Sequence, residues 1–315
     1  MMQSVISAEE LTRLVLDDLF RELENSRQWM RSLLRTLVSP PARRFARLAA
    51  RFDEMVAHVG FRESVRHVIS TFSHDVHRMG CEHIPETGPL LIASNHPGSY
   101  DSLLIAASLP RDDLKIIAAG FSMLRGLPNA SKHLIFVESP KGSPRNFSVV
   151  RAAIRHLRSG GALLIFPGGC IEPDPTVLSG AAKALNGWST SVELLMRKVP
   201  QTRVQISIVG GVLLPAFMRN PLITHWRGPR DALAVAGILQ TTIQMLLPGR
   251  VKLRPTISFG CPKTLGQLRR ENQSLHQSLI AEAGRLLEDH SNGHGYGRRS
   301  QAVGGRPPSI RFADN

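Results

Sequence analysis

His96 and Asp101 lie five positions apart in the segment 95–101, which reads Asn-His-Pro-Gly-Ser-Tyr-Asp. The segment follows an apolar stretch over residues 89–94 and precedes an apolar helical pattern, so it is predicted to form a strand-to-helix turn. Strand ends of open α/β folds are where catalytic groups collect. A carboxylate beside an imidazole fixes its tautomer and raises its basicity, which suits a general base near neutral pH. The same spacing occurs by chance around surface histidines, so its meaning depends on the rest of the chain.

A second candidate turn lies further along the chain. Residues 162–167 read as a buried strand, and Gly168, Gly169 and Cys170 end it in a tight loop. An amphipathic segment over 146–158, closed by Ser-Gly-Gly, comes just before that strand. The chain therefore runs from a strand through His-x4-Asp to a helix, and later from a helix through a strand into Phe-Pro-Gly-Gly.

This order of motifs resembles the glycerolipid acyltransferase family, which includes the glycerol-3-phosphate and lysophosphatidic acid acyltransferases. Four segments carry the resemblance, namely Asn95–Asp101, Leu134–Arg145, Phe166–Gly169 and Val204–Pro215. The segment just before the first motif, Gly80–Pro89, also resembles the family. The whole resemblance extends over roughly residues 79–262.

The resemblance implies a mechanism and a set of site residues. His96 would deprotonate an acceptor hydroxyl that attacks an acyl thioester, while Asp101 would hold the imidazole and stabilise the imidazolium. The thioester would be acyl-CoA or acyl carrier protein, used as a cosubstrate, and no other cofactor is expected. Backbone amides at the glycines and at the start of the helix would bind an oxyanion or a phosphate. The residues expected to bind substrate are Asn95, Gly98, Ser99, Lys141, Arg145, Pro167, Gly168 and Gly169.

The sequence departs from the family's pattern at the positions that bear on the acceptor. The family's usual Glu in the third motif is Gly169 here, and relatives with a phosphate-bearing acceptor carry arginines where this chain has Cys170 and Glu172. The basic residues of the second motif, Lys141 and Arg145, come later than the family's usual Arg. Lysophosphatidic acid or glycerol 3-phosphate is the first choice of acceptor, and a non-phosphate lipid hydroxyl is the alternative. A third reading is a non-catalytic basic lipid-binding protein that keeps the fold.

Charge and composition narrow the class of partner. The formal net charge of +14 favours anionic partners. Aromatic residues make up only 5%, and zinc-finger spacing and RNA-binding aromatic motifs are missing, so an anionic membrane surface is preferred and no nucleic acid is expected. No run approaches the about 20 apolar residues of a transmembrane helix. We expect a cytoplasmic protein, peripherally associated with the inner face of the membrane.

The three cysteines lack metal-like spacing. They are Cys81, Cys170 and Cys261, and an odd number without an apolar leader fits free thiols in a reducing cytoplasm. We therefore predict no metal site and no disulfide framework.

The elements that must position these residues are predicted to form an α/β fold, with a mainly parallel central sheet covered by helices and an N-terminal helical subdomain. The predicted divisions are a helical subdomain over 1–78, an acyltransferase α/β domain over 79–290 and a disordered basic tail over 291–315. The strand candidates are Leu90–Ser94, Lys115–Ala119, Leu134–Val137, Leu163–Phe166, Val204–Val209 and Thr256–Phe259. Predicted helices cover 101–109, 147–158, 188–198, 230–247 and 265–288.

Helical periodicity marks the N-terminal part. Ser7 is predicted to cap a first helix, a break is predicted at Pro40-Pro41, and further helices are predicted over 42–59 and 62–79. Arginines accompany the apolar face of the second helix, at positions 43, 44, 47 and 51. These helices either only pack on the core or also dock on anionic lipid, and one helix can do both.

Overall fold

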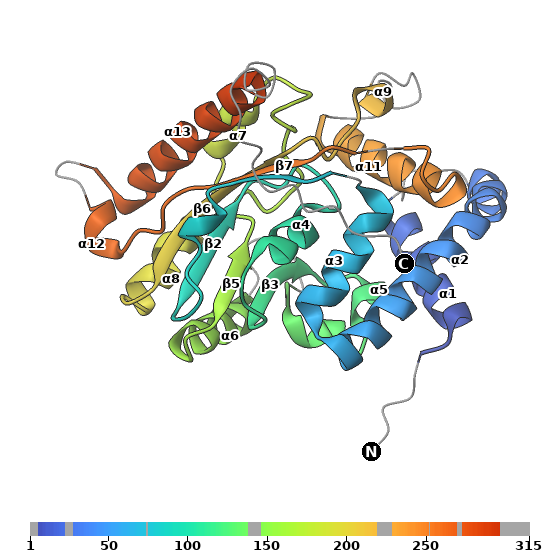
Figure 1. Ribbon diagram of the computed structural model, residues 1–315. Helices are drawn as coiled ribbons and strands as arrows, with labels where there is room; N and C mark the ends of the chain where they lie inside the picture. Colours follow the sequence, from blue (N-terminus) through green and yellow to red (C-terminus); the bar gives the residue numbers. More distant parts are fainter. Residues whose placement is uncertain are drawn as a thin grey trace.

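The protein is built around a seven-stranded sheet in the order β1-β7-β6-β2-β5-β3-β4, with helices on both faces (Figure 1). The structure, a computed structural model, describes residues 6–22, 28–73, 75–137, 146–218, 229–251, 253–269 and 273–296. Neighbouring strands are parallel, except that β6 and β7 are antiparallel. The predicted α/β fold with a mainly parallel sheet is confirmed.

The strands are short, and the central strands β2 and β5 are mostly apolar. They are β1 (His77–Met79), β2 (Leu90–Ser94), β3 (Leu114–Ala119), β4 (Leu134–Val137), β5 (Ala162–Ile165), β6 (Arg203–Gly210) and β7 (Thr256–Phe259). Every residue of β2 and β5 is buried, as in parallel sheets that are covered on both faces. Each of the six predicted strands is present within one residue of its predicted ends.

The longer helices connect these strands and cover the sheet. They are α1 (Ala8–Glu22), α2 (Gln28–Val59), α3 (Phe61–Phe72), α4 (Asp101–Ser108), α6 (Asn146–Arg158), α8 (Ser191–Lys198), α11 (Pro229–Leu246) and α13 (Leu275–Tyr296). Shorter helices are α5 (Ser122–Arg125), α7 (Ala181–Leu185), α9 (Pro215–Met218) and α12 (Leu265–Leu268), with 3-10 turns η1 (Cys81–His83) and η2 (Ala130–His133).

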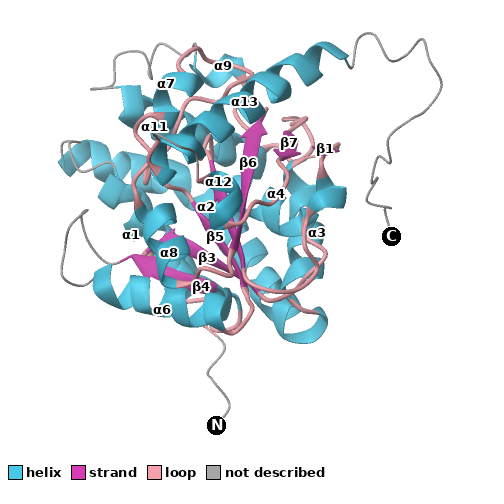
Figure 2. Ribbon diagram, turned by 90° about the vertical axis from the view of Figure 1, so that its left-hand side faces the viewer, coloured by secondary structure: helices cyan, strands magenta, loops and turns pink. Residues whose placement is uncertain are grey.

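The two faces of the sheet carry separate apolar cores. Along β2, Leu90 and Ile92 point into one core while Leu91 and Ala93 point into the other, because successive strand side chains alternate. Helices α2, α3 and α4 pack on the first core, and α6, α8 and α13 pack on the second, where they lie in front of the sheet in Figure 2. This double covering holds the ends of β2 and its neighbours in fixed positions.

Buried carboxylates join the N-terminal helices to the α/β part. Asp18 of α1 accepts hydrogen bonds from the first two amides of α5, at 3.0 and 2.8 Å. Asp53 of α2 accepts the amides of Asn129 and Ala130, at 2.9 and 2.8 Å. Each carboxylate satisfies amides that a helix start leaves without partners. The helices thus pack on the core, as both predicted roles required, while docking on lipid and the division at residue 78 stay predictions.

The predicted break at Pro40-Pro41 is wrong, because α2 continues through both prolines. A proline removes an intrahelical hydrogen bond and crowds the preceding turn, which is why the sequence indicated an end. Here Pro41 is buried, and the Ser39 hydroxyl donates to the carbonyl of Arg35 at 2.8 Å. Tertiary packing therefore outweighs the local preference. The predicted cap at Ser7 is confirmed by its hydrogen bond from the Glu10 amide at 3.1 Å.

Two further helix predictions need correction. The third helix ends at Phe72 instead of residue 79, because residues 77–79 form β1 and pair with β7. The predicted last helix is two helices, α12 and α13, and α13 reaches Tyr296, so the first residues of the predicted tail are helical. The rest of the tail lies outside the described residues.

Candidate active site

The carboxyl ends of three neighbouring strands form the candidate site. β2 pairs in parallel with both β5 and β6, so the segments that follow these strands meet at one edge of the sheet. They are the turn 95–100 before α4, the loop 166–174 after β5 and the turn 211–214 after β6. This edge is the usual ligand-binding edge of an open α/β sheet. The fold thus brings together the His96 turn and the Phe166 turn, which the sequence had singled out separately.

The structure brings His96 and Asp101 into direct contact. The His96 Nδ1 atom lies 2.7 Å from Oδ2 of Asp101. The Asp101 side chain is fully buried, whereas 29% of the His96 side chain is exposed. The imidazole therefore lies between a buried carboxyl and the surface, where a substrate can reach it.

Backbone amides hold the Asp101 carboxylate in place. Oδ2 accepts the Gly98 amide at 3.1 Å, and Oδ1 accepts the Ser102 amide at 2.7 Å. These two bonds fix the orientation of the carboxyl group toward His96. Where Nδ1 donates its hydrogen to Oδ2 of Asp101, Nε2 of His96 is free of hydrogen and able to accept a proton.

The surroundings of His96 make it a stronger base than a free imidazole. Burial lowers the pKa of His96, but the charge and hydrogen bond of Asp101, with a further contribution from Glu172, outweigh burial and raise the pKa above its ordinary 6.5. The Phe166 ring stacks on the imidazole, with 4.3 Å between ring centroids and 21° between planes. The ring thus has one face against an aromatic side chain and one nitrogen against a carboxylate.

Close packing fixes the turn that carries His96. A Cβ added at Gly98 would lie 3.0 Å from a methyl carbon of Val212, so the turn after β6 presses directly on this glycine. The Tyr100 hydroxyl donates to Gln244 at 2.6 Å and is 2.8 Å from the Thr241 hydroxyl, and both partners are on α11. Helix α11 and the turn after β6 therefore both pack against the turn that carries His96.

Asn95 is engaged with the backbone of the neighbouring strand. Its amide nitrogen donates to the Val209 carbonyl at 2.9 Å, and its oxygen accepts the Val209 amide at 2.8 Å. This pair of bonds joins the end of β2 to β6. Asn95 was predicted to bind substrate, but its side-chain amide is already occupied and its evident role is to hold the turn.

The Phe166–Gly169 turn needs its glycines for different reasons. The Gly169 amide donates to the Phe166 carbonyl at 3.0 Å, and its φ is +66°. Non-glycine residues rarely adopt this backbone conformation, so the glutamate usual in the family would be strained in this turn. At Gly168, an added Cβ would overlap the carboxyl group of Glu172.

Glu172 points into the protein. Only 4% of it is exposed, and its Oε1 accepts the indole N–H of Trp188 at 3.0 Å. Burial raises the pKa of Glu172 to about 7, although the Trp188 hydrogen bond, the His96 backbone and the His96 charge act in the opposite direction. The sequence placed this residue in a loop where relatives carry a phosphate-binding arginine, but here its carboxyl faces Trp188 and His96.

Asp174 joins two of the loops, and sequence reasoning gave it no role. It is fully buried, and its carboxylate accepts the amides of Gly211, Val212 and Leu213 at 2.9, 2.9 and 3.1 Å. It also accepts both the amide and the hydroxyl of Thr176. The available signal was an Asp between two prolines, since short polar side chains commonly bind backbone amides in loops.

The remaining predicted substrate contacts have different outcomes. The amides of Gly98 and Gly169 are used within the protein, which weakens their predicted role in binding an anion. Pro167 is buried and its carbonyl accepts the Ser189 amide, whereas Ser99 is exposed beside the His96 turn. Lys141 and Arg145 lie outside the described residues.

Among the described residues, no group of three or more His, Cys, Asp or Glu side chains is arranged to hold a metal ion. No helix within the described ranges is both long enough and apolar enough to cross a bilayer.

A family profile matches part of the sequence. Residues 75–203 match the sequence profile of a family described as Acyltransferase. The matched region contains His96, Asp101, Phe166 and Glu172, so the acyltransferase assignment predicted from the motifs is supported for these residues. The turn after β6, predicted as the family's last motif, lies beyond the matched residues.

Among solved structures, this chain is similar to the 1-acyl-sn-glycerophosphate (LPA) acyltransferase PlsC from Thermotoga maritima. The similarity has 17% sequence identity and a TM-score of 0.41, and it covers 95% of this chain and 98% of that chain. No curated protein sequence matches this chain. The family assignment above rests on the sequence profile.

Proposed function

We propose that this acyltransferase moves a fatty acyl group from a thioester donor, acyl-CoA or acyl carrier protein, to a hydroxyl group of a glycerolipid-type acceptor. The observation that carries the proposal is the 2.7 Å contact between His96 and the buried Asp101 at the ligand-binding edge of the sheet. A non-catalytic lipid-binding protein has no need to bury a carboxylate against a partly exposed imidazole, so the third reading of the sequence is disfavoured.

The proposed mechanism uses His96 as general base. Nε2 accepts the proton of the acceptor hydroxyl as its oxygen attacks the thioester carbonyl. Asp101 keeps the imidazole in the required tautomer and stabilises the imidazolium. When the tetrahedral intermediate collapses, the carbon–sulfur bond breaks and the thiolate takes the proton back from His96. The products are an ester and a free thiol, and no serine intermediate is formed.

The acceptor is the finer part of the proposal. Lysophosphatidic acid or glycerol 3-phosphate remains the first choice because the motifs resemble those of enzymes that use them. The non-phosphate alternative is supported by Glu172, which fills the loop position of a phosphate-binding arginine with a buried carboxyl group. Because that carboxyl is turned away from the surface, it also presents little repulsion to a phosphate.

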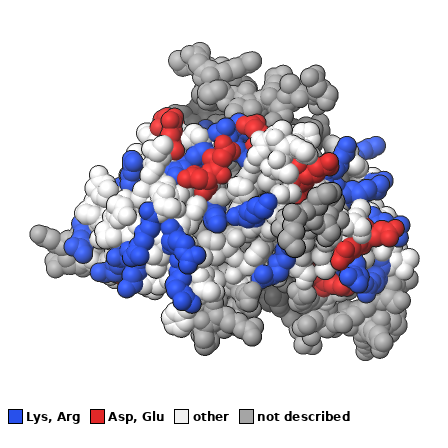
Figure 3. All heavy atoms as spheres, turned by 90° about the horizontal axis from the view of Figure 1, so that it is seen from below, with Lys and Arg blue, Asp and Glu red and all other residues white. Residues whose placement is uncertain are grey.

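We further propose that the enzyme acts at the inner face of an anionic membrane, as a cytoplasmic peripheral protein. Lys and Arg outnumber Asp and Glu by 39 to 25, and Figure 3 shows many basic side chains, with fewer acidic ones among them, on the face seen from below. On α2, Arg43, Arg47 and Arg51 are exposed, whereas Arg44 donates to carbonyl groups at the end of α11. Exposed arginines beside anionic lipid headgroups supply electrostatic attraction.

The test is to incubate the purified protein with labelled acyl-CoA, or with acyl carrier protein, and a panel of acceptors. The panel contains glycerol 3-phosphate, lysophosphatidic acid and uncharged lipid hydroxyls, and products are identified by mass spectrometry. We expect an acyl ester in the parent and none above background in His96→Ala. Ester formed only on uncharged acceptors would reject the first-choice acceptor, and ester formed equally by His96→Ala would reject the mechanism.

A further inference from the structure

Glu172 connects the two turns of the site through both its backbone and its side chain. Its amide donates to the carbonyl of His96 at 2.8 Å, which joins the loop after β5 to the turn after β2. Its carboxyl accepts the Trp188 indole N–H at 3.0 Å and lies against Gly168. A residue of the Phe166 loop is thus in direct contact with the backbone of the proposed base.

The glycine at position 168 is required by this carboxyl. A Cβ at that position would overlap Glu172 Oε1 and lie 3.0 Å from its Cδ. The Glu172 side chain has almost no exposed surface and is hydrogen-bonded to Trp188. It therefore has little room to move away from an added Cβ. The turn and the carboxyl therefore fit each other, and a change at one position should depend on the residue at the other.

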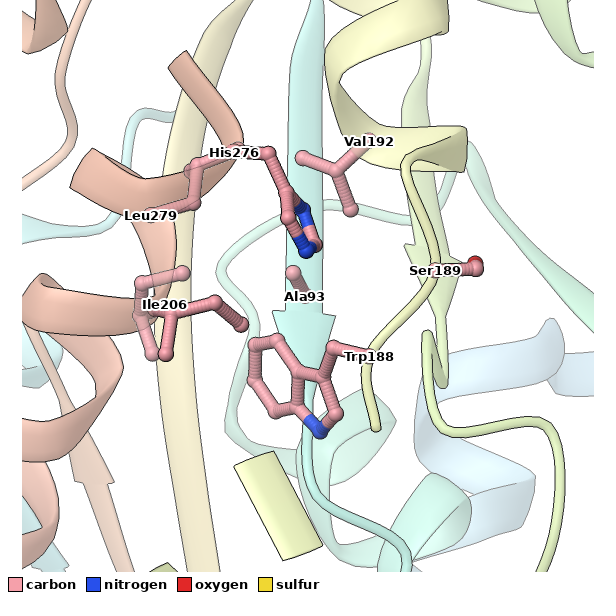
Figure 4. Close-up of a pocket in the computed structure, with 8 residues that line it drawn as sticks. Ala93, Trp188, Ser189, Val192, Ile206, His276 and Leu279 are labelled. Carbon is pink, nitrogen blue, oxygen red and sulfur yellow. The ribbon is translucent and has the colours of Figure 1, made fainter. Parts of the chain in front are cut away.

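The partner of Glu172 is itself held by the second core. Trp188 is buried, and its ring lines an apolar pocket together with Ala93, Val192 and His276. In Figure 4 the indole nitrogen lies on the side of the Trp188 ring away from His276. Trp188 thus packs on the sheet and α8 while its N–H remains available to fix the carboxyl.

Electrostatic coupling runs in both directions between Glu172 and His96. The charged groups that act on Glu172 are His96 and Asp101, and those that act on His96 are Asp101 and Glu172. A negative charge on Glu172 adds to that of Asp101 in favouring the protonated imidazole. Because His96 and Glu172 interact, their titrations belong to the pair and not to single residues.

We propose that Glu172 is a positioning residue for the reaction, which fixes the Phe166–Gly169 turn against the His96 backbone and stabilises the imidazolium formed when His96 accepts a proton. This inference rests on the proposed role of His96 as general base. Glu172 touches neither substrate nor reacting atoms in this role, and it acts through His96 and the turn.

The first test follows the His96 imidazole by NMR as a function of pH, in the full-length enzyme and in Glu172→Gln. Glutamine keeps the shape and removes the charge, so the midpoint of the His96 titration should fall by on the order of half a pH unit. Asp101→Asn should lower it further, while Glu193→Gln, a matched change at an ion pair on α8, should leave it unchanged. An unchanged midpoint in folded Glu172→Gln would overturn the proposed coupling.

The same variants separate this inference from the proposed function. If both hold, the acid limb of the kcat/KM profile moves to lower pH together with the NMR midpoint. If the NMR midpoint moves and the acid limb does not, Glu172 acts on His96 but His96 is not the base, and the proposed function fails instead.

The second test measures stability and does not use activity. Gly168→Ala should lower the melting temperature clearly in the parent but much less in a Glu172→Ala background, where the obstructing carboxyl is missing. The double-mutant comparison removes the separate effect of leaving Trp188 without its acceptor. Equal losses in the two backgrounds would overturn the mutual fit of the turn and the carboxyl.

Discussion

The two turns that meet at the site differ in how their polar groups are satisfied. In the turn after β2, Asp101 binds His96, Gly98 and Ser102, and all of them are within five positions of it in the chain. In the loop after β5, Glu172 binds Trp188 and the His96 backbone, and Asp174 binds the amides of residues 211–213. The carboxylate of the first turn is satisfied by its sequence neighbours, whereas the carboxylates of the second bind mainly to segments that are distant in sequence. We therefore expect changes in the first to affect chemistry and changes in the second to affect stability and the pH response.

The largest effect is expected at the base itself. His96→Ala should lower kcat/KM by about 10² to 10⁴, the usual contribution of a general base. Asp101→Asn should retain part of the activity, because the imidazole remains. Steady-state kinetics with one acyl thioester and one acceptor measures both. Normal turnover by His96→Ala would contradict the expectation that changes in the first turn affect the chemistry.

In the loop after β5, a substitution of Asp174 is expected to lower the stability of the protein most. Asp174→Ala leaves the amides of residues 211–213 buried without their acceptor, so we expect a loss of about 3 kcal/mol or more in the free energy of unfolding. Urea denaturation gives this number. Thr176→Val, which keeps the backbone amide and removes one exposed hydroxyl donor, serves as the milder comparison and should cost much less. Similar losses for the two variants would mean that the long-range amides contribute little.

Glu172 should make stability depend on pH. Because its pKa is raised from 4.5 to about 7, the protonated form is favoured in the folded state, so stability is fully present below pH 4.5 and is lost as pH rises through 7. Glu172→Gln avoids that loss and should be the more stable protein at pH 8, by up to about 3 kcal/mol. The difference between the two proteins, measured by urea denaturation at pH 5 and at pH 8, should grow with pH.

A difference that stays constant between these pH values would show that Glu172 does not titrate in this range. His96 contributes in the same sense, since its pKa is also raised, but His96 is present in both proteins and largely cancels in the comparison. Residual pH dependence common to both proteins therefore does not count against the prediction.

The smallest effect is expected away from both turns, on the exposed face of α2. Changing Arg43, Arg47 and Arg51 to glutamine should weaken sedimentation with anionic vesicles several-fold at 0.1 M salt and leave turnover of a water-soluble acceptor unchanged. The attraction should weaken at high salt, because the Debye length falls from about 10 Å at 0.1 M to about 3 Å at 1 M. Arg151, Arg155 and Arg158 of α6, changed in the same way, are the matched control. Equal loss in the control would indicate general charge attraction and no particular docking surface.

The contrast between the two turns also explains which predictions succeeded. The strands were located within one residue because continuous apolar runs mark buried parallel strands. The His96–Asp101 pair was found because partners close in sequence at a strand end remain close in space. Strand β1 was missed because residues 77–79 are a short segment whose strand pairing with β7 comes from the far end of the chain. The helix through Pro40 and Pro41 was missed for a related reason, since its continuity depends on tertiary packing.

The roles of Glu172 and Asp174 could not be read from the sequence, where both residues look like loop carboxylates that solvent would surround. Burial changes their chemistry, because a buried carboxyl must find hydrogen-bond donors, and its donors here come from other elements.

The sequence by itself determined the α/β class, the order of the strands along the chain, the acyltransferase match of residues 75–203 and the pairing of His96 with Asp101. These features depend on hydrophobic patterning and on short-range spacing, which a linear chain displays directly. Only the tertiary structure decided that the turns after β2 and β5 lie at one edge of the sheet and that Asn95 is hydrogen-bonded to β6. It also decided that Glu172 lies beside His96 and accepts a hydrogen bond from Trp188. Those facts depend on which strands are neighbours in the sheet and on what each side chain finds when water is excluded, and neither is set by local sequence.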